Sequence, residues 1–526
     1  MSVSSALPDK WVSVTLQAVC QRITDGTHQP PQFTDSGVPF LVIRNVISGS
    51  ISFHETKFVP QDVYAELNRR CPVEPGDVLY TAVGSYGTAV AVGERHRFSF
   101  QRHIAHLKPR QCVLSDYLRY FLNGPLGRGQ ADACARGVAQ KTVTLGCLSG
   151  FTMPLAPIAE QQRIVTALDE RLSELDAAVA SLERAERNLV RYRAAVLAAA
   201  CSGKLVPTEA DLARRAGRSY EPADQLLARI LTERRKANTK ARYEEPVQPD
   251  ASKLPKLPEG WMWVCLDQIL AEPLSNGRSV PDAADGFPVL RLTAIRGGAI
   301  DLRQHKIGQW TADQAHPFLV QAGDMLLSRG NGTLSLVGRG GVVPESPISV
   351  AFPDTMIRVR RSELVDLGYL AMLWNSPLVR TQIEKEARTT AGIYKVNQAI
   401  LERVYLPLAP VAEQVRIVAE VDRHLSRADA LAASIAQSKR RAQRLRRAIL
   451  AAAFQGRLVP QDPHDEPASV LLDRIRAQAA TAAPAFAPRR GRPTAPARAA
   501  EPIVTYDAPT PKRRGRPPGS TNKAKA

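Results

Sequence analysis

Two histidines three residues apart, His103 and His106, have the spacing closest to that of a metal site. A structural or catalytic zinc ion needs three or four protein ligands, and no matching second pair accompanies these two. The glycine-rich stretch Gly330–Leu334 lacks the spacing and the lysine of a phosphate-binding loop, so a tight turn between strands is the favoured interpretation. We therefore expect neither a metal nor a cofactor in this chain.

Catalytic groups that act on nucleic acid are equally poorly supported. A nuclease-like acidic cluster would have to combine Asp9 with Glu55 and Lys57, across a gap of 46 residues and from common residue types. An adenine methyltransferase would need an Asn-Pro-Pro-Tyr type of tetrapeptide, and the sequence contains no Asn-Pro-Pro. We expect a chain without catalytic residues.

The composition predicts a large globular protein with an acidic partner. A length of 526 residues is typical of three or four domains, and 44% hydrophobic residues is enough for sizeable cores. The net charge of +19 indicates a polyanionic partner, a basic tail, or both. The seven cysteines are scattered singly, which favours reduced thiols over a disulfide framework. No signal sequence or membrane-spanning run is evident, so we expect a soluble, cytoplasmic protein with no membrane contact.

An internal duplication determines the expected architecture. Pro154–Pro207 and Pro407–Pro460 align without a gap at an offset of 253, and 29 of the 54 aligned positions are identical. In the first copy, leucine or valine recurs every seven residues from Leu168 to Val196, which is the pattern of a coiled-coil seam. Gly203 and Gly456 stand where a left-handed cap would end each helix. Each copy is therefore predicted to be a long helix, and the two are expected to pair in antiparallel fashion.

The regions before the two helices differ from each other much more than the helices do. They share an opening phrase (LPDKW from Leu7, LPEGW from Leu257) and the stretches Val73–Thr81 and Val320–Ser328. Short β-rich runs alternate with turns and helical stretches, which is typical of an α+β globule. The expected organisation is 1–153 first α+β domain, 154–207 central coiled-coil helix, 208–256 short helix and linker, 257–406 second α+β domain, 407–460 distal coiled-coil helix, 461–480 short helical segment, and 481–526 disordered basic tail.

These phrases carry a family resemblance. PLAPIAEQQRIV and PLAPVAEQVRIV, the heptad helix, GKLVP and GRLVP, the LPEGW opening, and Gln461–Arg476 together resemble the specificity subunit of Type I restriction-modification enzymes. The resemblance implies two α/β target recognition domains separated by two long antiparallel coiled-coil helices. It also implies that the chain itself is not catalytic. Its partners would be double-stranded DNA, two methyltransferase subunits and restriction subunits, and S-adenosylmethionine, ATP and Mg would be held by those partner subunits. Thr208–Tyr220 departs mildly from the family pattern and predicts a longer linker after the central helix.

The contrast between like helices and unlike domains supports the same view on physical grounds. A pseudo-two-fold pair of rods presents two similar surfaces, which suits two copies of one partner. Unlike domains suit unlike half-sites, so we expect an asymmetric, two-part DNA target whose gap is set by the rods. Two alternatives are an autonomous nuclease or methyltransferase, which needs a motif that the chain lacks, and a purely structural coiled-coil scaffold, which needs no divergent domains.

Base-reading and phosphate-binding side chains are expected at strand ends and in glycine-flanked loops. The candidates in the first domain are Arg44, Asn45, Ser85, Tyr86, Arg102, Lys141 and Thr142; those in the second are Arg296, Arg329, Asn331, Thr333, Arg388, Tyr394 and Lys395.

The last 46 residues form a separate element. Residues 481–526 contain ten Lys or Arg and two acidic residues, a net +8, and their Pro- and Ala-rich composition predicts disorder. Two Arg-Gly-Arg-Pro stretches, with Arg490 and Arg492 in one and Arg514 and Arg516 in the other, resemble AT-hooks, which bind A·T-rich minor grooves. A nonspecific basic tail is the alternative interpretation.

Overall fold

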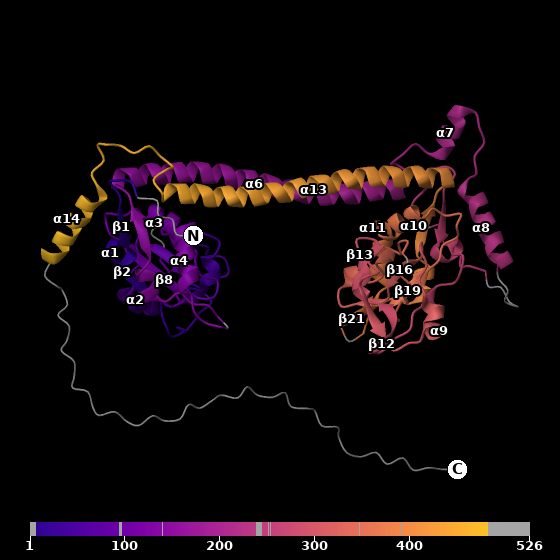
Figure 1. Cartoon of the computed structure of the whole chain (residues 1–526), viewed down its shortest axis with the longest axis horizontal. Coiled ribbons are helices and arrows are strands. Elements are labelled where there is room, and N and C mark those ends of the chain that lie inside the picture. Colours follow the sequence, from indigo (N-terminus) through magenta and orange to yellow (C-terminus); the bar gives the residue numbers. More distant parts are fainter. Residues whose placement is uncertain are drawn as a thin grey trace, which may run out of the picture.

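The two repeated segments form the two longest helices of the computed structural model, α6 (Ile158–Cys201) and α13 (Val411–Ala453). They lie side by side, and a mixed helix-and-sheet domain lies below each end of the pair (Figure 1). The structure describes residues 7–93, 97–138, 140–237, 245–250, 252, 254–346, 348–390 and 392–481. The predicted α+β fold with two domains and a pair of long helices is confirmed.

The helix pair is antiparallel, and the seven-residue stripe forms its seam. Leu168, Leu172, Leu189 and Val196 of α6 are buried, and so are Val421, Ala428, Ile435 and Ala442 of α13. Arg193 of α6 bonds Asp429 at 2.6 Å, whereas Glu186, earlier in α6, bonds Lys439, later in α13, at 2.9 Å. With a rise of 1.5 Å per residue, the two helices, of 44 and 43 residues, are each roughly 65 Å long.

Each long helix ends at a glycine that the far domain covers. Gly203 and Gly456 have φ of +66° and +67°, the left-handed conformation that the sequence predicts for a helix cap. A Cβ on Gly203 would lie 2.4 Å from Pro258 Cγ, and one on Gly456 would lie 2.3 Å from Pro8 Cγ. The proline of each repeated LPxxW opening therefore packs on the end of a long helix, and no larger residue fits at either cap.

Domain 1 is built around a four-stranded antiparallel sheet in the order β2-β8-β5-β6. A smaller sheet, β4-β3-β7, lies beside it, and β1 pairs with β9 directly before the long helix. The strands are β1 (Val12–Thr15), β2 (Cys20–Asp25), β3 (Val38–Leu41), β4 (Lys57–Val59), β5 (Val78–Thr81), β6 (Ala89–Ala91), β7 (Ser99–Phe100), β8 (Ile104–Pro109) and β9 (Thr152–Leu155). The helices are α1 (Leu16–Val19), η1 (Ile43–Asn45), α2 (Gln61–Arg70), α3 (Ser115–Asn123), α4 (Pro125–Cys134) and α5 (Leu145–Ser149).

Domain 2 repeats this plan with a larger sheet, in the order β11-β19-β16-β18-β14-β13, and with the pair β10-β22 before α13. Its strands are β10 (Met262–Cys265), β11 (Ser275–Asn276), β12 (Asp282–Leu290), β13 (Ile295–Arg296), β14 (Ala299–Ile300), β15 (His305–Gly308), β16 (Met325–Ser328), β17 (Gly330–Asn331), β18 (Gly340–Val342), β19 (Met356–Val359), β20 (Arg388–Thr390), β21 (Ile393–Lys395) and β22 (Tyr405–Leu408). Its helices are η3 (Leu266–Ile269), η4 (Leu292–Ala294), α9 (Ala312–Ala315), η5 (His316–Phe318), η6 (Leu334–Leu336), α10 (Leu367–Trp374), α11 (Pro377–Glu386) and α12 (Gln398–Glu402).

Each domain core includes the ends of both long helices and one short helix. The core of domain 1 takes residues from the start of α6, from the end of α13 and from α14 (Ala468–Thr481). The core of domain 2 takes residues from the end of α6, from the start of α13 and from α8 (Ala223–Ala237), which follows α7 (Glu209–Ala216). The C-terminal half of the chain thus completes domain 1, and each end of the rod is part of the core of one domain.

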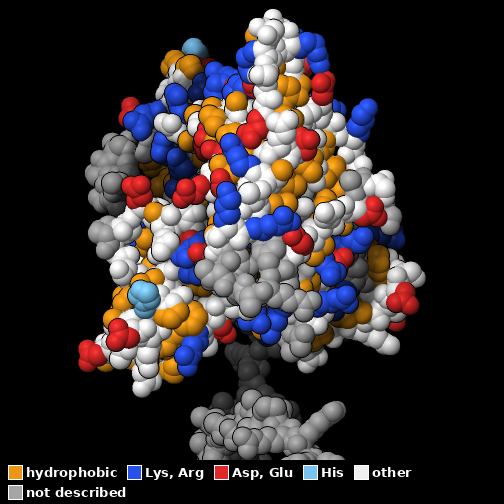
Figure 2. Space-filling view, turned by 90° about the vertical axis from the view of Figure 1, so that its right-hand side faces the viewer, with side chains coloured by type: hydrophobic (Ala, Val, Ile, Leu, Met, Phe, Trp, Pro, Cys, Tyr) orange, Lys and Arg blue, Asp and Glu red, His pale blue; other side chains and the backbone are white. Residues whose placement is uncertain are grey.

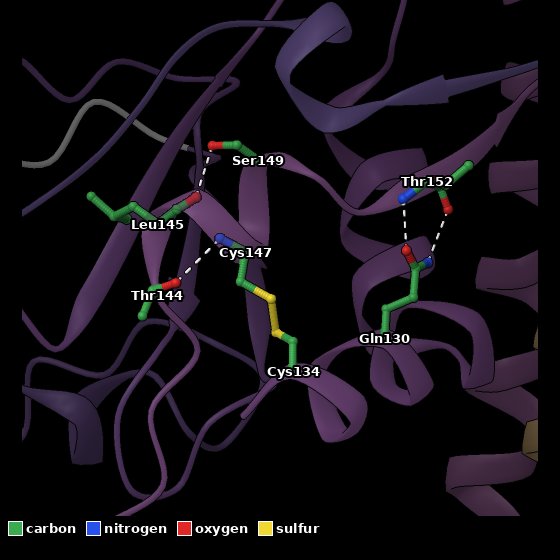
Figure 3. Close-up of a disulfide and its surroundings, with 7 residues drawn as sticks. All are labelled: Gln130, Cys134, Thr144, Leu145, Cys147, Ser149 and Thr152. Carbon is green, nitrogen blue, oxygen red and sulfur yellow. Dashed lines mark hydrogen bonds between the residues drawn. A yellow bond between two sulfur atoms is a disulfide. The ribbon is translucent and has the colours of Figure 1, made fainter. Parts of the chain in front are cut away.

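One disulfide corrects the expectation of seven reduced thiols. Cys134, at the end of α4, is bonded to Cys147 of α5 (Figure 3). The other five cysteines are free and buried, and burial raises the pKa of the Cys71 thiol to about 11. The pairing was not predicted because the two residues meet only when α4 and α5 pack together.

Among the helices in the described ranges, none combines the length and the apolar character needed to cross a membrane.

Candidate nucleic-acid interface

A glycine-rich loop follows the central strand of each domain and runs beside a second segment from later in the chain. In domain 1 the loop after β5 contacts residues 141–143: the Gly84 amide donates to the Lys141 carbonyl at 2.8 Å, and the Val143 amide donates to the Ala82 carbonyl at 2.8 Å. In domain 2 the loop after β16 forms β17, which pairs with β21 and through it with β20. The two domains thus build the same kind of exposed edge from the same two parts of the chain.

Six predicted residues of domain 2 meet at this edge. Asn331 on β17 lies opposite Tyr394 on β21, and Arg388 on β20 lies opposite Lys395 on β21. The other two, Arg329 and Thr333, flank β17 on either side. β21 lies on the side of domain 2 that faces domain 1 (Figure 1). The fold therefore collects residues from positions 329–333 and 388–395 into one surface between the two ends of the rod.

The pair formed by Arg388 and Lys395 has the electrostatics of an anion site. Both side chains are exposed, they belong to directly opposed strand positions, and neither has a side-chain partner within the described ranges. Like charges at opposed positions destabilise a sheet by a few tenths of a kcal/mol or more. An anion placed between them would reverse the sign of that interaction, and a DNA phosphate is such an anion.

Three of the four neighbouring candidates in domain 1 are available to a ligand. Ser85 and Lys141 are exposed and Thr142 is half-buried. Tyr86 is only 9% exposed, and its hydroxyl donates to Asp132 at 3.0 Å. Tyr86 therefore holds the loop in this structure and is not placed to read a base.

The other candidates do not join these surfaces. Asn45 is 1% exposed, and its side-chain amide bonds the backbone of Val42 and His54 within domain 1. Arg44 is exposed but donates to the Glu55 carbonyl at 2.6 Å. Arg102 is exposed on the turn before β8, and Arg296 is exposed at the end of β13. Asn45 was predicted from its residue type, and the structure instead gives it a buried, bonded position.

The histidine pair also has a structural explanation. His106 is buried, and its two ring nitrogens lie 2.8 Å from Asp77 and 3.1 Å from the Cys71 sulfur. Asp77 in turn caps the turn before β5 by accepting from the Glu74 amide at 2.8 Å. Both nitrogens of His106 are therefore occupied by protein groups that fix the start of the central strand.

A second duplicated motif, which the sequence analysis missed, connects each loop to the rod. It reads Asn-x-Pro-Leu-x-Arg-x-Gln-x-acid and occupies Asn123–Asp132 and Asn375–Glu384, at an offset of 252. The side-chain amide of Asn123 bonds the Ala89 backbone at 2.8 Å in both directions, and Asn375 bonds the Gly340 backbone in the same way. A comparison of the two divergent regions at this offset would have revealed the motif.

The exposed Arg136 was also missed, although it occupies the place of Arg388. Its backbone pairs with Thr142 through two hydrogen bonds of 2.8 and 3.0 Å, just as Arg388 pairs with Lys395. It adds a cation without a side-chain partner in the described ranges to the edge of domain 1.

The repeated Ala-Glu-Gln phrase at the start of each long helix locks the helix to its own domain. Glu160 accepts from the Trp11 indole at 2.9 Å, and burial raises the pKa of this carboxyl. The Gln161 side chain accepts from the Leu114 amide at 2.9 Å, and Gln414 accepts from the Asp366 amide at 2.9 Å. All of these carboxamides and carboxylates are buried, so the direction in which each long helix leaves its domain is fixed by specific hydrogen bonds.

The end face of the molecule at domain 2 has mixed charge. In Figure 2, Lys and Arg side chains are interspersed with Asp and Glu over the described residues in view. A surface of this kind does not produce the one-sign field that attracts a polyanion. The face in this view therefore does not stand out as a surface for a polyanion.

Comparisons with known proteins agree with this architecture. No protein-family model matches the chain. The EcoKI specificity subunit of Escherichia coli K12 is 24% identical over 494 residues, which cover 90% of this chain and 96% of that protein. The EcoBI subunit of Escherichia coli is 26% identical, covering 90% and 94%, and the StySPI subunit of Salmonella potsdam is 22% identical, covering 90% and 96%. A solved chain of a type I R-M system has the same fold, with a TM-score of 0.57, 18% identity, and coverage of 86% of this chain and all of that one. Over about nine-tenths of its length, the chain is thus similar to the specificity subunits of Type I restriction enzymes.

Proposed function

We propose that this chain is the DNA-reading subunit of a Type I restriction-modification complex, in which each domain reads one half of an asymmetric, two-part target. The observation that carries the proposal is a contrast between two parts of each domain: the joint, where it is attached to the rod, and the exposed edge. The joints to the rod use matching bonds, such as those of Gln161 and Gln414, whereas the exposed edges differ in loop length and residue type. Matching joints hold both domains on the rod in the same way, and unlike edges give the two domains different base preferences.

The rod sets the gap between the half-sites. Its ends are embedded in the two domain cores, so the distance between the readers follows the helix length and not a flexible linker. A fixed distance between two readers fixes the spacing of the sequences that they contact, as in dimeric repressors.

The outer faces of the rod dock two methyltransferase subunits and, through them, restriction subunits. Tyr192 of α6 and Leu445 of α13 occupy equivalent positions at an offset of 253, and they are 41% and 48% exposed. Equivalent exposed apolar groups on two symmetric helices suit two copies of one partner. In this proposal the chain is not catalytic, acts in the cytoplasm, and carries no cofactor. S-adenosylmethionine, ATP and Mg belong to the partner subunits.

The basic tail adds affinity without sequence preference. Arg490, Arg492, Arg514 and Arg516 fall outside the described residues, so this part of the proposal relies on the Arg-Gly-Arg-Pro motifs alone. Arginines of this kind lie in narrow A·T minor grooves, where the negative potential is enhanced.

The deciding experiment is a methylation map of DNA from cells that express the chain with its methyltransferase subunits. The expected result is one split motif with two unlike halves and a constant gap. Methylation by the purified chain alone would favour an autonomous enzyme, and equal affinity for all sequences in a gel shift would favour a structural scaffold. Either result would refute the proposal.

A further inference from the structure

The duplicated motif places one arginine of each domain directly beneath the glycine-rich loop. Arg128 lies on α4 and Arg380 lies at the equivalent position on α11. Neither residue stands out by type or charge in the sequence, and neither belongs to the exposed edge itself. Each arginine contacts the glycine-rich loop of its own domain.

In domain 1, Arg128 and Asp132 hold the loop through Tyr86. Arg128 Nη1 donates to the Tyr86 carbonyl at 2.6 Å, and the guanidinium carbon lies 4.8 Å from the centre of the Tyr86 ring. Arg128 Nε donates to Asp132 at 3.2 Å, and the Tyr86 hydroxyl donates to the same carboxylate oxygen at 3.0 Å. A Cβ on Gly87 would lie 2.2 Å from Arg128 Nη1, so the next loop residue must be glycine for the arginine to occupy this place.

In domain 2, Arg380 makes the corresponding contact from a more buried position. Only 9% of Arg380 is exposed, and its Nη2 donates to the Ser335 carbonyl at 3.4 Å and to Glu384 at 3.2 Å. Its Nη1 lies 3.5 Å from the Cβ position of Gly338, which has φ of +66°. Nε and Nη1 are buried without a hydrogen-bond partner within the described ranges. Burying a guanidinium with two unsatisfied nitrogens costs free energy. In return, the buried position brings the Arg380 side chain into contact with the loop.

We propose that Arg128 and Arg380 are positioning residues that set the conformation of the two glycine-rich loops and so determine base preference, each in its own half-site. The inference rests on the proposed function. Glycine gives these loops wide backbone freedom, whereas base reading needs side chains held to within about 0.5 Å. A planar guanidinium anchored to the acid four residues later fixes a loop carbonyl in both distance and direction, which a flexible ammonium does not.

The same helices supply a matched control. Gln130 accepts from the Thr152 amide at 2.7 Å and donates to the Thr152 carbonyl at 2.9 Å (Figure 3). Gln382 makes the same pair of bonds with Tyr405, at 2.9 and 3.0 Å. Both glutamines hold the strand that leads into the rod and do not touch the loop. Gln130→Ala and Gln382→Ala should therefore loosen the domain without changing the loop.

The test is a selection from duplexes with randomised sequence, using the complex of the full chain with its methyltransferase subunits. Arg128→Met should weaken base preference about tenfold or more at one half-site, roughly the effect of removing one good base-specific hydrogen-bond pair, and leave the other half-site unchanged. Arg380→Met should do the reverse. The lysine variants should lie between wild type and methionine, and they serve as the test if a methionine variant does not fold. The glutamine variants should lower Tm but keep both base preferences.

Three outcomes would overturn the inference. One is unchanged preference in both arginine variants while the wild type selects a two-part sequence; this result leaves the proposed function intact. Another is an equal effect of the arginine and glutamine variants at equal loss of Tm, which would mean that the arginines act only on stability. The last is a wild-type complex that selects no two-part sequence, which would overturn the proposed function as well.

Discussion

Replacing Phe454 by alanine should loosen domain 1 although Phe454 belongs to the far end of the chain. Phe454 follows α13, is 1% exposed, and packs against Tyr117 and Phe121 with ring centroids 4.9 and 5.7 Å apart. Truncation of a fully buried phenylalanine costs about 3–5 kcal/mol, because transfer free energy is lost and a cavity remains. At about 1.4 kcal/mol per factor of ten, openings that release this side chain become roughly 10²- to 4 × 10³-fold more frequent.

Hydrogen exchange resolved by peptide is the suitable assay, since a chain with two domain cores does not unfold in two states. Faster exchange is expected in α3 and in the last turns of α13, and unchanged exchange in domain 2. The control is Leu445→Ala on the same helix, where the side chain is 48% exposed and the cost should stay within about 0.5 kcal/mol. Equal acceleration in both domains, or an effect no larger than that of Leu445→Ala, would refute the view that the end of α13 is part of the domain 1 core.

Three further predictions follow from single features. The double variant Cys134→Ser with Cys147→Ser should lose about 3 kcal/mol of domain 1 stability in urea unfolding, because the bond closes a loop with a sequence separation of 13; a loss below about 1 kcal/mol, or free thiols in the wild type by alkylation, would contradict it. Burial alone raises the pKa of Glu209, but hydrogen bonds from Arg218 and Arg416 bring it below its ordinary value. Its stabilising effect is therefore present at neutral pH and lost as the pH falls below the ordinary glutamate range, so Glu209→Gln should lower Tm at pH 7 and much less at pH 3; an equal loss at both pH values would be inconsistent with this. Removal of residues 481–526 should reduce the slope of log affinity against log salt by about 0.9 for each DNA phosphate that the tail neutralises, and an unchanged slope would mean that the tail does not bind DNA.

Some candidate site residues could be predicted because their positions depend on local sequence. Asn331 and Thr333 stand in a glycine-flanked turn next to an apolar strand, and such turns project from a fold whatever surrounds them. Asn45 also follows an apolar strand, but its side chain bonds two backbone groups and is covered by its own domain. Residue type and local context do not distinguish these two cases, because burial depends on segments distant in the sequence.

The contacts of Arg128 and Arg380 with the loops could not be predicted from the sequence, for a related reason. Arg128 and Arg380 lie on helices some 40 residues after the loops that they contact, in regions that otherwise differ between the two halves. Their role is visible only when α4 and α11 are packed against the central strands. The disulfide between Cys134 and Cys147 has the same origin, since α4 and α5 must first come together.

The sequence by itself determined the rods and their duplication, because a seven-residue apolar period and a repeat at constant offset are local, additive signals. Only the tertiary structure decided which rod ends enter which core, which candidate readers share a surface, and which side chains hold them there. Those outcomes depend on contacts between Phe454 and α3, between β17 and β21, and between Arg128 and Tyr86. Such contacts join parts of the chain whose spacing in sequence carries no periodic signal, so packing alone brings them together.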